Sequence, residues 1–244
     1  MNPATIVIVT YNRLEKTKRC IESVLNNTTY PHFITVVDNG STDGTVEYLM
    51  SLKGEFANFI LLSNNLGVAK AHNIGWMLSD KNYYVNLDDD VVILRPEWLE
   101  ALVGMSDNLQ QYGAFGHIWF DDRKRKFVDG YYLSDNEDGM DYFCPCSLIP
   151  KRTFEKVGYW NIEFGLYGFE DFDYRIRMQM SGLRYCYTGD TNYIEHIGPN
   201  MDPSDAKELY DLKVNSRNYG ENKRFEFIRE YESGTRSLKV SVPM

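Results

Sequence analysis

A run of three carboxylates between two apolar segments is the feature that most constrains this chain. Residues 83–87, Tyr-Tyr-Val-Asn-Leu, have the aromatic and β-branched composition of a strand, and three aspartates follow at positions 88–90. A second apolar run, residues 91–94, precedes Arg95 and Pro96. The pattern predicts a strand that ends in an acidic turn. In an open α/β sheet ligands bind at the carboxyl ends of the strands, so these acids are expected at a binding edge.

The three adjacent carboxylates need compensation. They repel one another, and burying them without a cation or strong hydrogen-bond donors costs several kcal/mol. A divalent metal is the simplest partner, because Mg²⁺ and Mn²⁺ prefer hard oxygen ligands and Mg²⁺ typically takes one or two carboxylates with substrate phosphates. The alternative is a solvated acidic turn without a ligand. Other motifs in the chain favour the metal.

Composition narrows the class of partner. The chain has 244 residues, and its 43% hydrophobic content supports a substantial core. Aromatic residues make up 14% and include 18 tyrosines, which suits a surface that stacks on rings or sugars. The formal charge of −9 argues against a phosphate backbone as the main partner, although a local basic patch is compatible with it.

The cysteines and the lengths of the apolar runs indicate the cellular compartment in which the protein is expected. Cys20, Cys144, Cys146 and Cys186 lack paired zinc-ligand spacing, and we expect them to be reduced and mostly buried, as in a cytosolic protein. No apolar run approaches about 18 residues, and the first residues lack the basic and apolar regions of a signal peptide. We therefore expect a soluble cytoplasmic protein with no transmembrane segment.

The order of apolar segments predicts the fold class. Residues 5–10 are almost all β-branched, the pattern of a central parallel strand, and residues 14–25 have the spacing of an amphipathic helix. Repetition of this β-α order predicts a parallel sheet with right-handed crossovers. The further strands expected are residues 33–37, 59–63, 83–87, 114–120, 127–133, 185–187 and 192–197. The further helices expected are residues 45–52, 67–79, 96–110, 151–157, 171–181, 204–215 and 221–231.

The remaining segments are expected to be turns and loops. Residues 121–126 are a charged turn, residues 134–141 an acidic loop, and residues 141–150 an apolar stretch with small residues that we do not assign. We find no repeat, low-complexity segment or linker. One domain covering residues 1–244 is therefore favoured.

Together, residues 5–196 resemble the family 2 glycosyltransferases, enzymes of the GT-A fold. The resemblance rests on four features in order. The first two follow strands: Thr10-Tyr11-Asn12, and the segment Asp-Asn-Gly-Ser-Thr-Asp-Gly-Thr at 38–45. The third is the segment Asn-Leu-Gly-Val-Ala-Lys-Ala-His-Asn-Ile-Gly at 65–75, which leads to the aspartates, and the fourth is Gly-Tyr-Trp at 158–160, which precedes Gly-Phe-Glu-Asp-Phe-Asp at 168–173 and a later His196. Each motif alone is weak evidence, whereas the ordered set is specific.

The resemblance implies a nucleotide-sugar site. Asp38 would accept a hydrogen bond from a uracil N–H; the alternative is that it caps an Asx turn. Thr10 and Tyr11 would offer backbone groups and a ring to the base, or else pack at the strand end. His72 stands where similar enzymes often have Arg, so Lys70 is a candidate substitute, and either is otherwise a solvated helix position. The implied donor-binding residues are Thr10, Tyr11, Asn12, Arg13, Asp38, Asn65, Gly67, Lys70, His72, Asn73, Asp88 and Asp89.

The resemblance also implies a metal site. Asp88 and Asp90 form the Asp-x-Asp motif, in which Asp88 leans toward the ribose and the metal and Asp90 binds a Mn²⁺ or Mg²⁺ ion that bridges the donor phosphates. The role of Asp89 is not assigned. His196 matches a histidine that often completes this site; the alternative is a packed or capping histidine.

A second acidic cluster carries the implied catalytic base. In the resemblance Asp171 removes the proton of the acceptor hydroxyl, Glu170 orients the acceptor and Asp173 holds the start of the helix. Burial beside aromatic residues would raise the pKa of Asp171 toward a useful value. The alternative is that these carboxylates only complement the helix dipole. Acceptor contacts are expected from Trp160, Gly168 and Phe169, for which core packing is the other interpretation.

These features predict an α/β fold of the GT-A type: a Rossmann-like, mostly parallel central sheet flanked by helices, with a smaller mixed sheet and a helical C-terminal tail. Residues 1–113 would form the nucleotide-sugar-binding half, residues 114–198 the acceptor-binding and catalytic half, and residues 199–244 the tail. Basic tail residues such as Lys223 and Arg224 either close over the diphosphate as a lid or belong to a terminal helical wrap.

The implied activity is transfer of a sugar from a nucleotide diphosphate donor, a UDP-sugar, to an acceptor hydroxyl. One base without a second carboxylate placed as in a glycosidase indicates direct displacement with inversion. A sugar-nucleotide pyrophosphorylase would need a Gly-rich phosphate loop, which residues 10–13 lack, and a non-catalytic binding module is disfavoured by Asp90, Asp171 and His196. The acceptor stays open among a glycan, a protein, a lipid-linked precursor and a modified nucleic-acid base, the last disfavoured by charge.

Overall fold

The computed structural model describes residues 2–52, 57–79, 82–117, 126–128, 131–133, 145–190, 192–198 and 207–241. Most strands join one nine-stranded sheet in the order β3-β2-β1-β4-β9-β6-β10-β8-β7, and two more form the antiparallel pair β11-β5. The strands are β1 (Ala4–Thr10), β2 (His32–Asp38), β3 (Ala57–Leu61), β4 (Tyr83–Asp88), β5 (Val91–Ile93), β6 (Tyr112–Gly116), β7 (Lys126–Val128), β8 (Tyr131–Leu133), β9 (Cys146–Pro150), β10 (Arg184–Thr188) and β11 (Ile194–His196).

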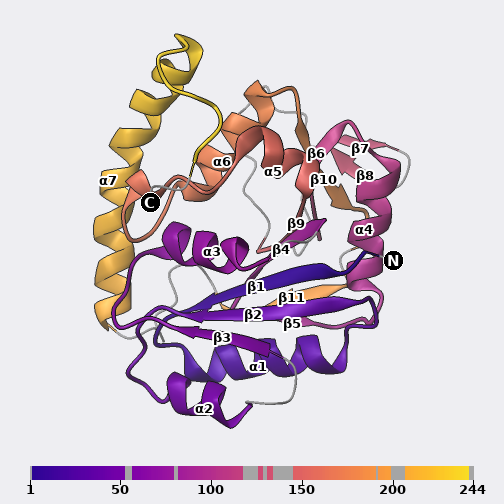
Figure 1. Cartoon of the computed structure of the whole chain (residues 1–244), viewed down its shortest axis with the longest axis vertical. Helices are drawn as coiled ribbons and strands as arrows, with labels where there is room; N and C mark the ends of the chain where they lie inside the picture. The colour runs from indigo at the N-terminus through magenta and orange to yellow at the C-terminus, as the bar shows by residue number, and fades with distance from the viewer. Residues whose placement is uncertain are drawn as a thin grey trace.

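Helices cover both faces of the sheet. Figure 1 shows α1 and α2 on one side of strands β1 to β3 and α3 on the other. The helices are α1 (Leu14–Asn26), α2 (Thr45–Ser51), α3 (Val68–Met77), α4 (Trp98–Asn108), α5 (Lys151–Val157), α6 (Glu170–Met180) and α7 (Lys207–Glu232), with a 3₁₀ turn, η1, at Ile162–Phe164. All eight pairs of neighbouring strands in this sheet have a defined register, and only β8 and β9 run opposite to the other strands. The expected GT-A-like α/β architecture, mostly parallel, is confirmed.

The first half of the sheet aligns the ends of its parallel strands. β1 lies between β2 and β4, with Thr10 opposite Asp38 and Val9 opposite Asp88. In Figure 1, β1 runs from the N-terminus toward the side of the molecule where α7 lies. Three segments that are distant in sequence therefore end at one edge.

Close packing of α3 on β1 depends on a glycine. A Cβ atom built on Gly75 would lie 2.5 Å from Cγ1 of Val7, which is buried in β1. Any larger side chain at position 75 would push the helix off the sheet. Glycine at this position therefore lets α3 lie directly on β1.

The second half differs from the expectation in two strands. β9, within the stretch left unassigned, pairs antiparallel with both β4 and β6 and is buried along its length. The single strand expected at 127–133 was wrong: the structure has two short antiparallel strands, β7 and β8. The strand expected to reach residue 120 ends at Gly116 in the described residues, and the charged turn at 121–125 and the loop at 134–141 lie outside them.

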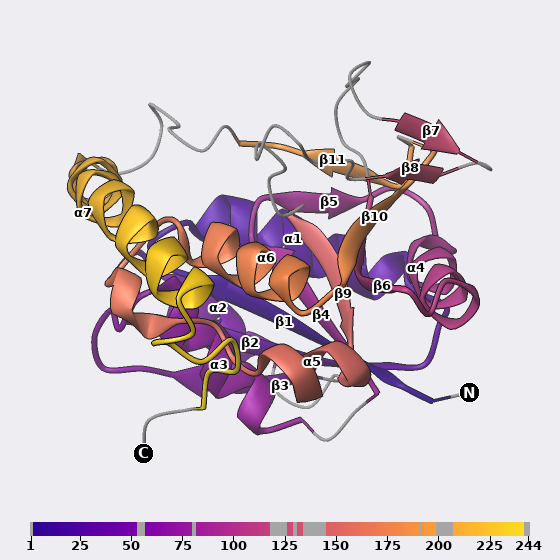
Figure 2. The same cartoon turned by 90° about the horizontal axis from the view of Figure 1, so that it is seen from above.

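The small sheet joins the two halves. β5 follows the acidic turn directly and packs along α1, and β11 pairs with it so that His196 lies opposite Val91 (Figure 2). The backbone N–H of Ile197 also donates to the carbonyl of Asp90 at 2.8 Å. The smaller sheet is thus antiparallel, and its pairing brings the end of β11 to the acidic turn.

The C-terminal tail corrects another expectation. The two helices expected at 204–215 and 221–231 are one continuous helix, α7, which passes through Gly220 without a break. Figure 2 shows α7 lying beside α6, at the end of the molecule opposite α4. Beyond it the chain returns to the core, where Val240 forms a β-bridge with Gly158.

Three of the four cysteines lie in the described part of the chain. Cys20, Cys146 and Cys186 are free and buried, and Cys144 lies outside the described part of the chain. Among the described helices, none has both the length and the apolar composition that a membrane-spanning helix needs.

Candidate active site

Asp38 lies at the end of β2 and is fully buried. Its Oδ2 atom accepts hydrogen bonds from the backbone N–H groups of Gly40 at 3.2 Å and Ser41 at 3.0 Å. The Asx-turn interpretation therefore describes one of its oxygens. The other, Oδ1, is buried and has no hydrogen-bond partner among the described residues. A buried carboxylate oxygen without a donor is costly, so this atom suits a ligand N–H group.

Asparagine side chains tie together the loops that follow β1, β2 and β3. Asn12 has a positive φ of 52°, and its Oδ1 accepts the backbone N–H of Thr42 at 2.7 Å. Asn39 donates to Oδ1 of Asn65 at 2.9 Å and accepts the backbone N–H of Leu66 at 2.9 Å. Asn12 and Asn65, two of the expected donor-binding residues, thus fix the conformation of these loops.

The expected donor-binding residues of α3 differ in their burial and in their contacts. Lys70 is exposed, whereas His72 is buried and its ring lies 5.8 Å from that of Trp160. Burial lowers the pKa of His72 to about 4, so the ring is neutral at physiological pH. Asn73 bonds the backbone of Trp160 through both ends of its amide, each at 2.9 Å. Asn73 therefore anchors the segment after α5 to α3.

Gly67 marks a second contact between this helix and the later segment. Its φ is +94°, and a Cβ atom there would lie 2.5 Å from the carbonyl oxygen of Gly165. Both the backbone angle and the space require glycine. The segment that contains the second acidic cluster thus packs directly on the start of α3.

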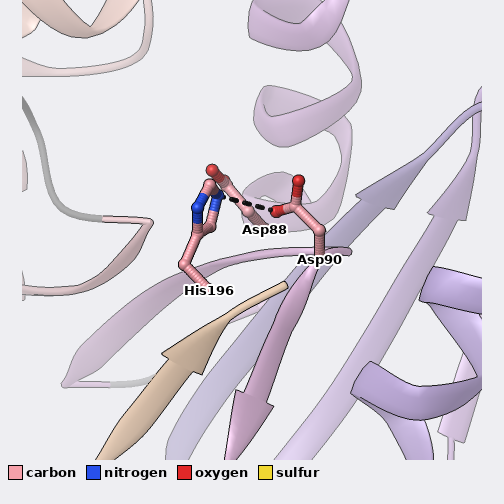
Figure 3. A group of neighbouring side chains, drawn as sticks. All are labelled: Asp88, Asp90 and His196. Carbon is pink, nitrogen blue, oxygen red and sulfur yellow. Dashed lines mark ion pairs between the residues drawn. The ribbon is translucent and has the colours of Figure 1, made fainter. Parts of the chain in front are cut away.

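Asp88, Asp90 and His196 come together at the acidic turn. Figure 3 shows the His196 ring facing both carboxylates, and its Nε2 atom lies 3.2 Å from Oδ1 of Asp90. One ligand atom of each residue lies within 4.8 Å of those of the other two. The predicted metal-binding residues are therefore neighbours, in an arrangement set by the pairing of β5 with β11.

Arg13 forms ion pairs with two of the three aspartates. Its Nη1 lies 2.6 Å from Oδ1 of Asp89, and its Nη2 lies 2.6 Å from Oδ2 of Asp90, with all three side chains largely buried. Thr17 also donates to Asp89, at 3.4 Å. Asp89, whose role the sequence left unassigned, is thus the residue that fixes Arg13. This leaves Oδ1 of Asp90 facing His196.

The electrostatics of the turn match a cation site. Desolvation by surrounding protein atoms and the charges of Asp90 and Asp89 raise the pKa of Asp88, even though part of its side chain reaches solvent. Burial acts to raise the pKa of Asp90 as well, but the contacts with His196 and Arg13 outweigh it, and this pKa is lowered. Two carboxylates and an imidazole are a donor set that suits Mn²⁺, so these residues fit a divalent ion.

The second acidic cluster begins α6. Glu170 and Asp171 occupy its first turn, after Phe169, whose φ of 68° is in the left-handed region. Burial and the charge of Asp171 raise the pKa of Glu170 to about 8, and burial raises the pKa of Asp171. The charge of Asp171 is also the smallest of the causes that raise the pKa of Asp88, so the two clusters influence one another electrostatically.

Asp173 differs from its two neighbours. It is buried and forms an ion pair of 2.7 Å with Arg177, which also donates to the carbonyls of Val157 and Tyr159. Tyr231 of α7 donates its hydroxyl proton to Asp173 at 2.7 Å. The expected structural role of Asp173 at the helix start agrees with these contacts.

Several residues that shape the site were not found from the sequence. The spacing of four between Asp173 and Arg177 is a recognisable helical ion-pair signal. The pairing of Arg13 with two aspartates, and of Tyr231 with Asp173, joins residues too far apart for any local pattern. Trp160 and Phe169 remain candidates for acceptor contacts. Trp160 is mostly buried, and the centre of its ring lies 4.7 Å from that of the Tyr174 ring.

Comparison with known proteins gives a consistent picture. A family model described as glycosyl transferase family 2 matches residues 5–159, more than half of the chain. An uncharacterised protein of Sinorhizobium fredii is 22% identical over 232 residues, which cover 84% of this chain and 25% of that protein. An uncharacterised glycosyltransferase of Haemophilus influenzae is 28% identical over 114 residues, covering 46% of this chain and 35% of that one. A chondroitin synthase of Pasteurella multocida is 32% identical over 97 residues, 39% of this chain and 10% of the synthase. The chain thus spans about a third or less of the length of these relatives.

Solved structures share the fold. A mannosyltransferase of Pyrobaculum calidifontis, in complex with GDP-Man and Mn²⁺, superposes with a TM-score of 0.64 at 17% identity, covering 82% of this chain and 58% of that one. S. aureus TarS, in complex with UDP-GlcNAc, gives a TM-score of 0.63 at 15% identity, covering 79% of this chain and 58% of that one. At these identities the likeness concerns the fold.

Proposed function

Because this chain belongs to glycosyl transferase family 2, we propose that it transfers a sugar from a nucleotide diphosphate donor to an acceptor hydroxyl with inversion at the anomeric carbon. One observation carries the proposal. The ligand atoms of Asp88, Asp90 and His196 lie within 4.8 Å of one another, and the charge of Asp171, in the first turn of α6, contributes to the raised pKa of Asp88. A cation site with a half-buried carboxylate near it is what such a transfer needs.

The donor would be a UDP-sugar with a divalent cation. Asp88, Asp90 and His196 would hold the ion, which neutralises charge on the departing diphosphate. The buried Oδ1 atom of Asp38 is available for a base N–H group, as on the edge of uracil. Relatives of the same fold were solved with UDP-GlcNAc or with GDP-Man and Mn²⁺, which supports a nucleotide-sugar donor and leaves UDP against GDP to experiment.

Asp171 would be the general base. Its carboxylate accepts the proton of the acceptor hydroxyl while that oxygen forms a bond to the anomeric carbon and the bond from this carbon to the diphosphate breaks. Burial raises the pKa of Asp171, which makes it a stronger base than a solvated aspartate. Glu170, whose pKa is raised to about 8, is protonated at neutral pH and can donate a hydrogen bond to the acceptor. A single base on one side of the sugar favours one displacement, hence inversion.

Thermal unfolding tests the donor and the metal together. The protein is heated with UDP-glucose, UDP-galactose, UDP-N-acetylglucosamine or GDP-mannose, each with and without Mn²⁺. A ligand at a hundred times its Kd stabilises the folded state by about 2.7 kcal/mol, which raises Tm by roughly 5–10 °C in a chain of this size. We expect such a rise with at least one UDP-sugar, only when Mn²⁺ is present, and none in Asp90→Ala.

Asp171→Asn separates binding from chemistry. This variant should keep the donor-dependent rise in Tm and lose both transfer and the slow hydrolysis of the donor by water. Absence of a Tm rise with every donor would contradict the proposed function. A rise without hydrolysis or transfer in the unaltered protein would instead indicate a nucleotide-sugar-binding module.

A further inference from the structure

We propose that α7 positions the catalytic turn, defined here as residues 168–171, and that the contact between Gly220 and the ring of Phe169 sets the placement of Glu170 and Asp171. This inference rests on the proposed function, because it assigns positioning residues to the same catalytic site. Neither Gly220 nor Phe169 is required to touch the reacting atoms. One backbone conformation and three sets of contacts support it.

The catalytic turn is held in an unfavourable backbone conformation. Phe169 has a φ of 68° and stands directly before Glu170, the first residue of α6. A bulky residue with positive φ is strained and persists only where surrounding contacts impose it. No side chain caps the start of α6 at this residue, so packing around the Phe169 ring has to supply the constraint.

α7 supplies that packing through a glycine. A Cβ atom on Gly220 would lie 2.5 Å from Cδ2 of Phe169 and 3.2 Å from the carbonyl oxygen of Gly168. The helix backbone itself therefore lies against the catalytic turn. A glycine inside a helix is less favourable than alanine, so close approach to the ring gives a reason for glycine here.

One turn further along α7, a cationic side chain packs on the same Phe169 ring. The guanidinium of Arg224 lies 5.2 Å from the centre of the Phe169 ring and 5.7 Å from that of Phe172. These two rings pack edge to face, 6.4 Å apart, on either side of the two carboxylates in sequence. Arg224 and Gly220 thus hold both aromatic residues that flank Glu170 and Asp171.

The C-terminal part of α7 is anchored independently of the catalytic turn. The ring of Phe227 packs edge to face on Phe164 of η1 at 5.2 Å. Tyr231 donates to the buried carboxylate of Asp173 in α6. Arg236, just beyond the helix, forms an ion pair of 2.7 Å with Glu163. Because these contacts fix α7 against η1 and α6, the position of Gly220 relative to Phe169 is determined too.

The test replaces Gly220 by alanine and uses Gly104→Ala as the matched control. Gly104 is also inside a helix, but a Cβ atom built on it meets nothing within 4 Å. Hydrolysis is measured with the sugar nucleotide, among the four named above, that raises Tm most. We expect kcat to fall about tenfold or more in Gly220→Ala, because displacement of a catalytic group by about 1 Å can cost a hundredfold, with KM for the donor within about twofold. Gly104→Ala should retain both constants.

A double-mutant cycle tests whether the ring transmits the effect. In a Phe169→Ala background the added Cβ at position 220 has no ring to displace, so Gly220→Ala should change kcat little further. Equal fold-losses in the two backgrounds would overturn the inference, as would wild-type kcat in Gly220→Ala. If Gly220→Ala does not fold, Arg224→Met serves instead: a lowered kcat at unchanged KM supports the inference, and wild-type constants overturn it.

A readout without turnover keeps this inference separate from the proposed function. The carboxyl carbon of Glu170 is followed by NMR as the pH is raised. Movement of its titration midpoint in Gly220→Ala, but not in Gly104→Ala, supports the positioning role, and coincident curves overturn it. This holds even if no donor binds and no donor is hydrolysed, an outcome that would reject the glycosyltransferase activity alone.

Discussion

Arg13 is the residue that lets three aspartates share one turn. It neutralises part of their charge through two contacts of 2.6 Å, on Asp89 and Asp90. The contact with Asp90 uses Oδ2 and leaves Oδ1 toward His196, so the guanidinium and a metal ion would occupy different sides of the same carboxylate. The sequence placed Arg13 among the donor-binding residues, and its observed contacts give it a further part in orienting Asp90.

Arg13→Met should destabilise the protein more without metal than with it. Removing one partner of a buried ion pair costs about 3–5 kcal/mol, because the other charge is left unpaired. A bound Mn²⁺ ion would compensate part of that loss, so Mn²⁺ should raise the free energy of unfolding more in the variant than in the wild type. Urea unfolding in EDTA and in Mn²⁺ measures both values.

Arg95→Met is the control for this prediction. Arg95 forms an ion pair of the same length, 2.6 Å, with Asp190, but its side chain is 40% exposed and that of Asp190 38%. Exposed pairs contribute about 0–1 kcal/mol, so this change should be small and independent of Mn²⁺. Equal Mn²⁺ increments in wild type and Arg13→Met would contradict the assigned role.

Glu170 makes stability depend on pH. Its ordinary pKa of 4.5 is raised to about 8 in the folded protein by burial and by Asp171. Between these values the folded protein holds a proton that the unfolded chain releases. Stability from this group is therefore complete below about pH 4.5 and is lost as the pH rises to about 8.

Glu170→Gln should remove this loss, because an amide does not ionise. The free energy of unfolding of the variant, minus that of the wild type, is expected to increase from pH 4.5 to 8 and to level off above. Urea unfolding across this range in EDTA measures it, with the exposed Glu155→Gln as a control that follows the wild type. A constant difference across the range would show that Glu170 titrates normally.

At the scale of elements, α6 is fixed by an ion pair of its own and by groups from two neighbouring segments. Asp173 in its first turn bonds Arg177 one turn later, and Arg177 is fully buried with bonds to the carbonyls of Val157 and Tyr159. Tyr231 brings α7 to the same carboxylate. Satisfied buried networks of this kind define a single packing arrangement, because each member left alone is costly.

Tyr231→Phe should lower the free energy of unfolding by about 1.5–3 kcal/mol, the usual contribution of a hydrogen bond to a charged group. Without the hydroxyl, the hydrogen bond left to Oδ1 of Asp173 among the described residues is the one that Asn161 donates at 3.4 Å. Tyr219→Phe is the control, since Tyr219 lies on the same helix and is 49% exposed. Urea unfolding of both variants is the measurement, and equal values would mean that the bond adds nothing to stability.

At the scale of the whole molecule, the site exists because strand ends coincide. The register of β1 with β2 and β4 aligns Thr10, Asp38 and Asp88 at one edge. The β5–β11 pair then adds His196, and the packing of Gly67 on Gly165 holds the segment before the second acidic cluster against the start of α3. No single element contains more than a part of the site.

Local patterns predicted most elements well where their period was clear. The helix expected at 151–157 is α5 (Lys151–Val157), and α1 differs from its expected bounds by one residue. β9 was missed because five consecutive buried residues carry no alternation and are too few to distinguish a strand from a loop. The break expected near Gly220 is absent, since neighbouring α6 and η1 hold α7 in place.

The amino-acid sequence by itself determined the fold class and the candidates for chemistry, because strand and helix periods and ordered motifs are local properties. It also identified Asp88, Asp90 and His196 as a group, through a resemblance, and the structure brings their ligand atoms within 4.8 Å of one another. Only the tertiary structure decided which partner each side chain meets: Arg13 on two aspartates, Asn73 on the Trp160 backbone, and Gly220 on the Phe169 ring. Such contacts depend on strand register and helix packing, which sum small interactions over the whole chain and leave no mark in any one segment.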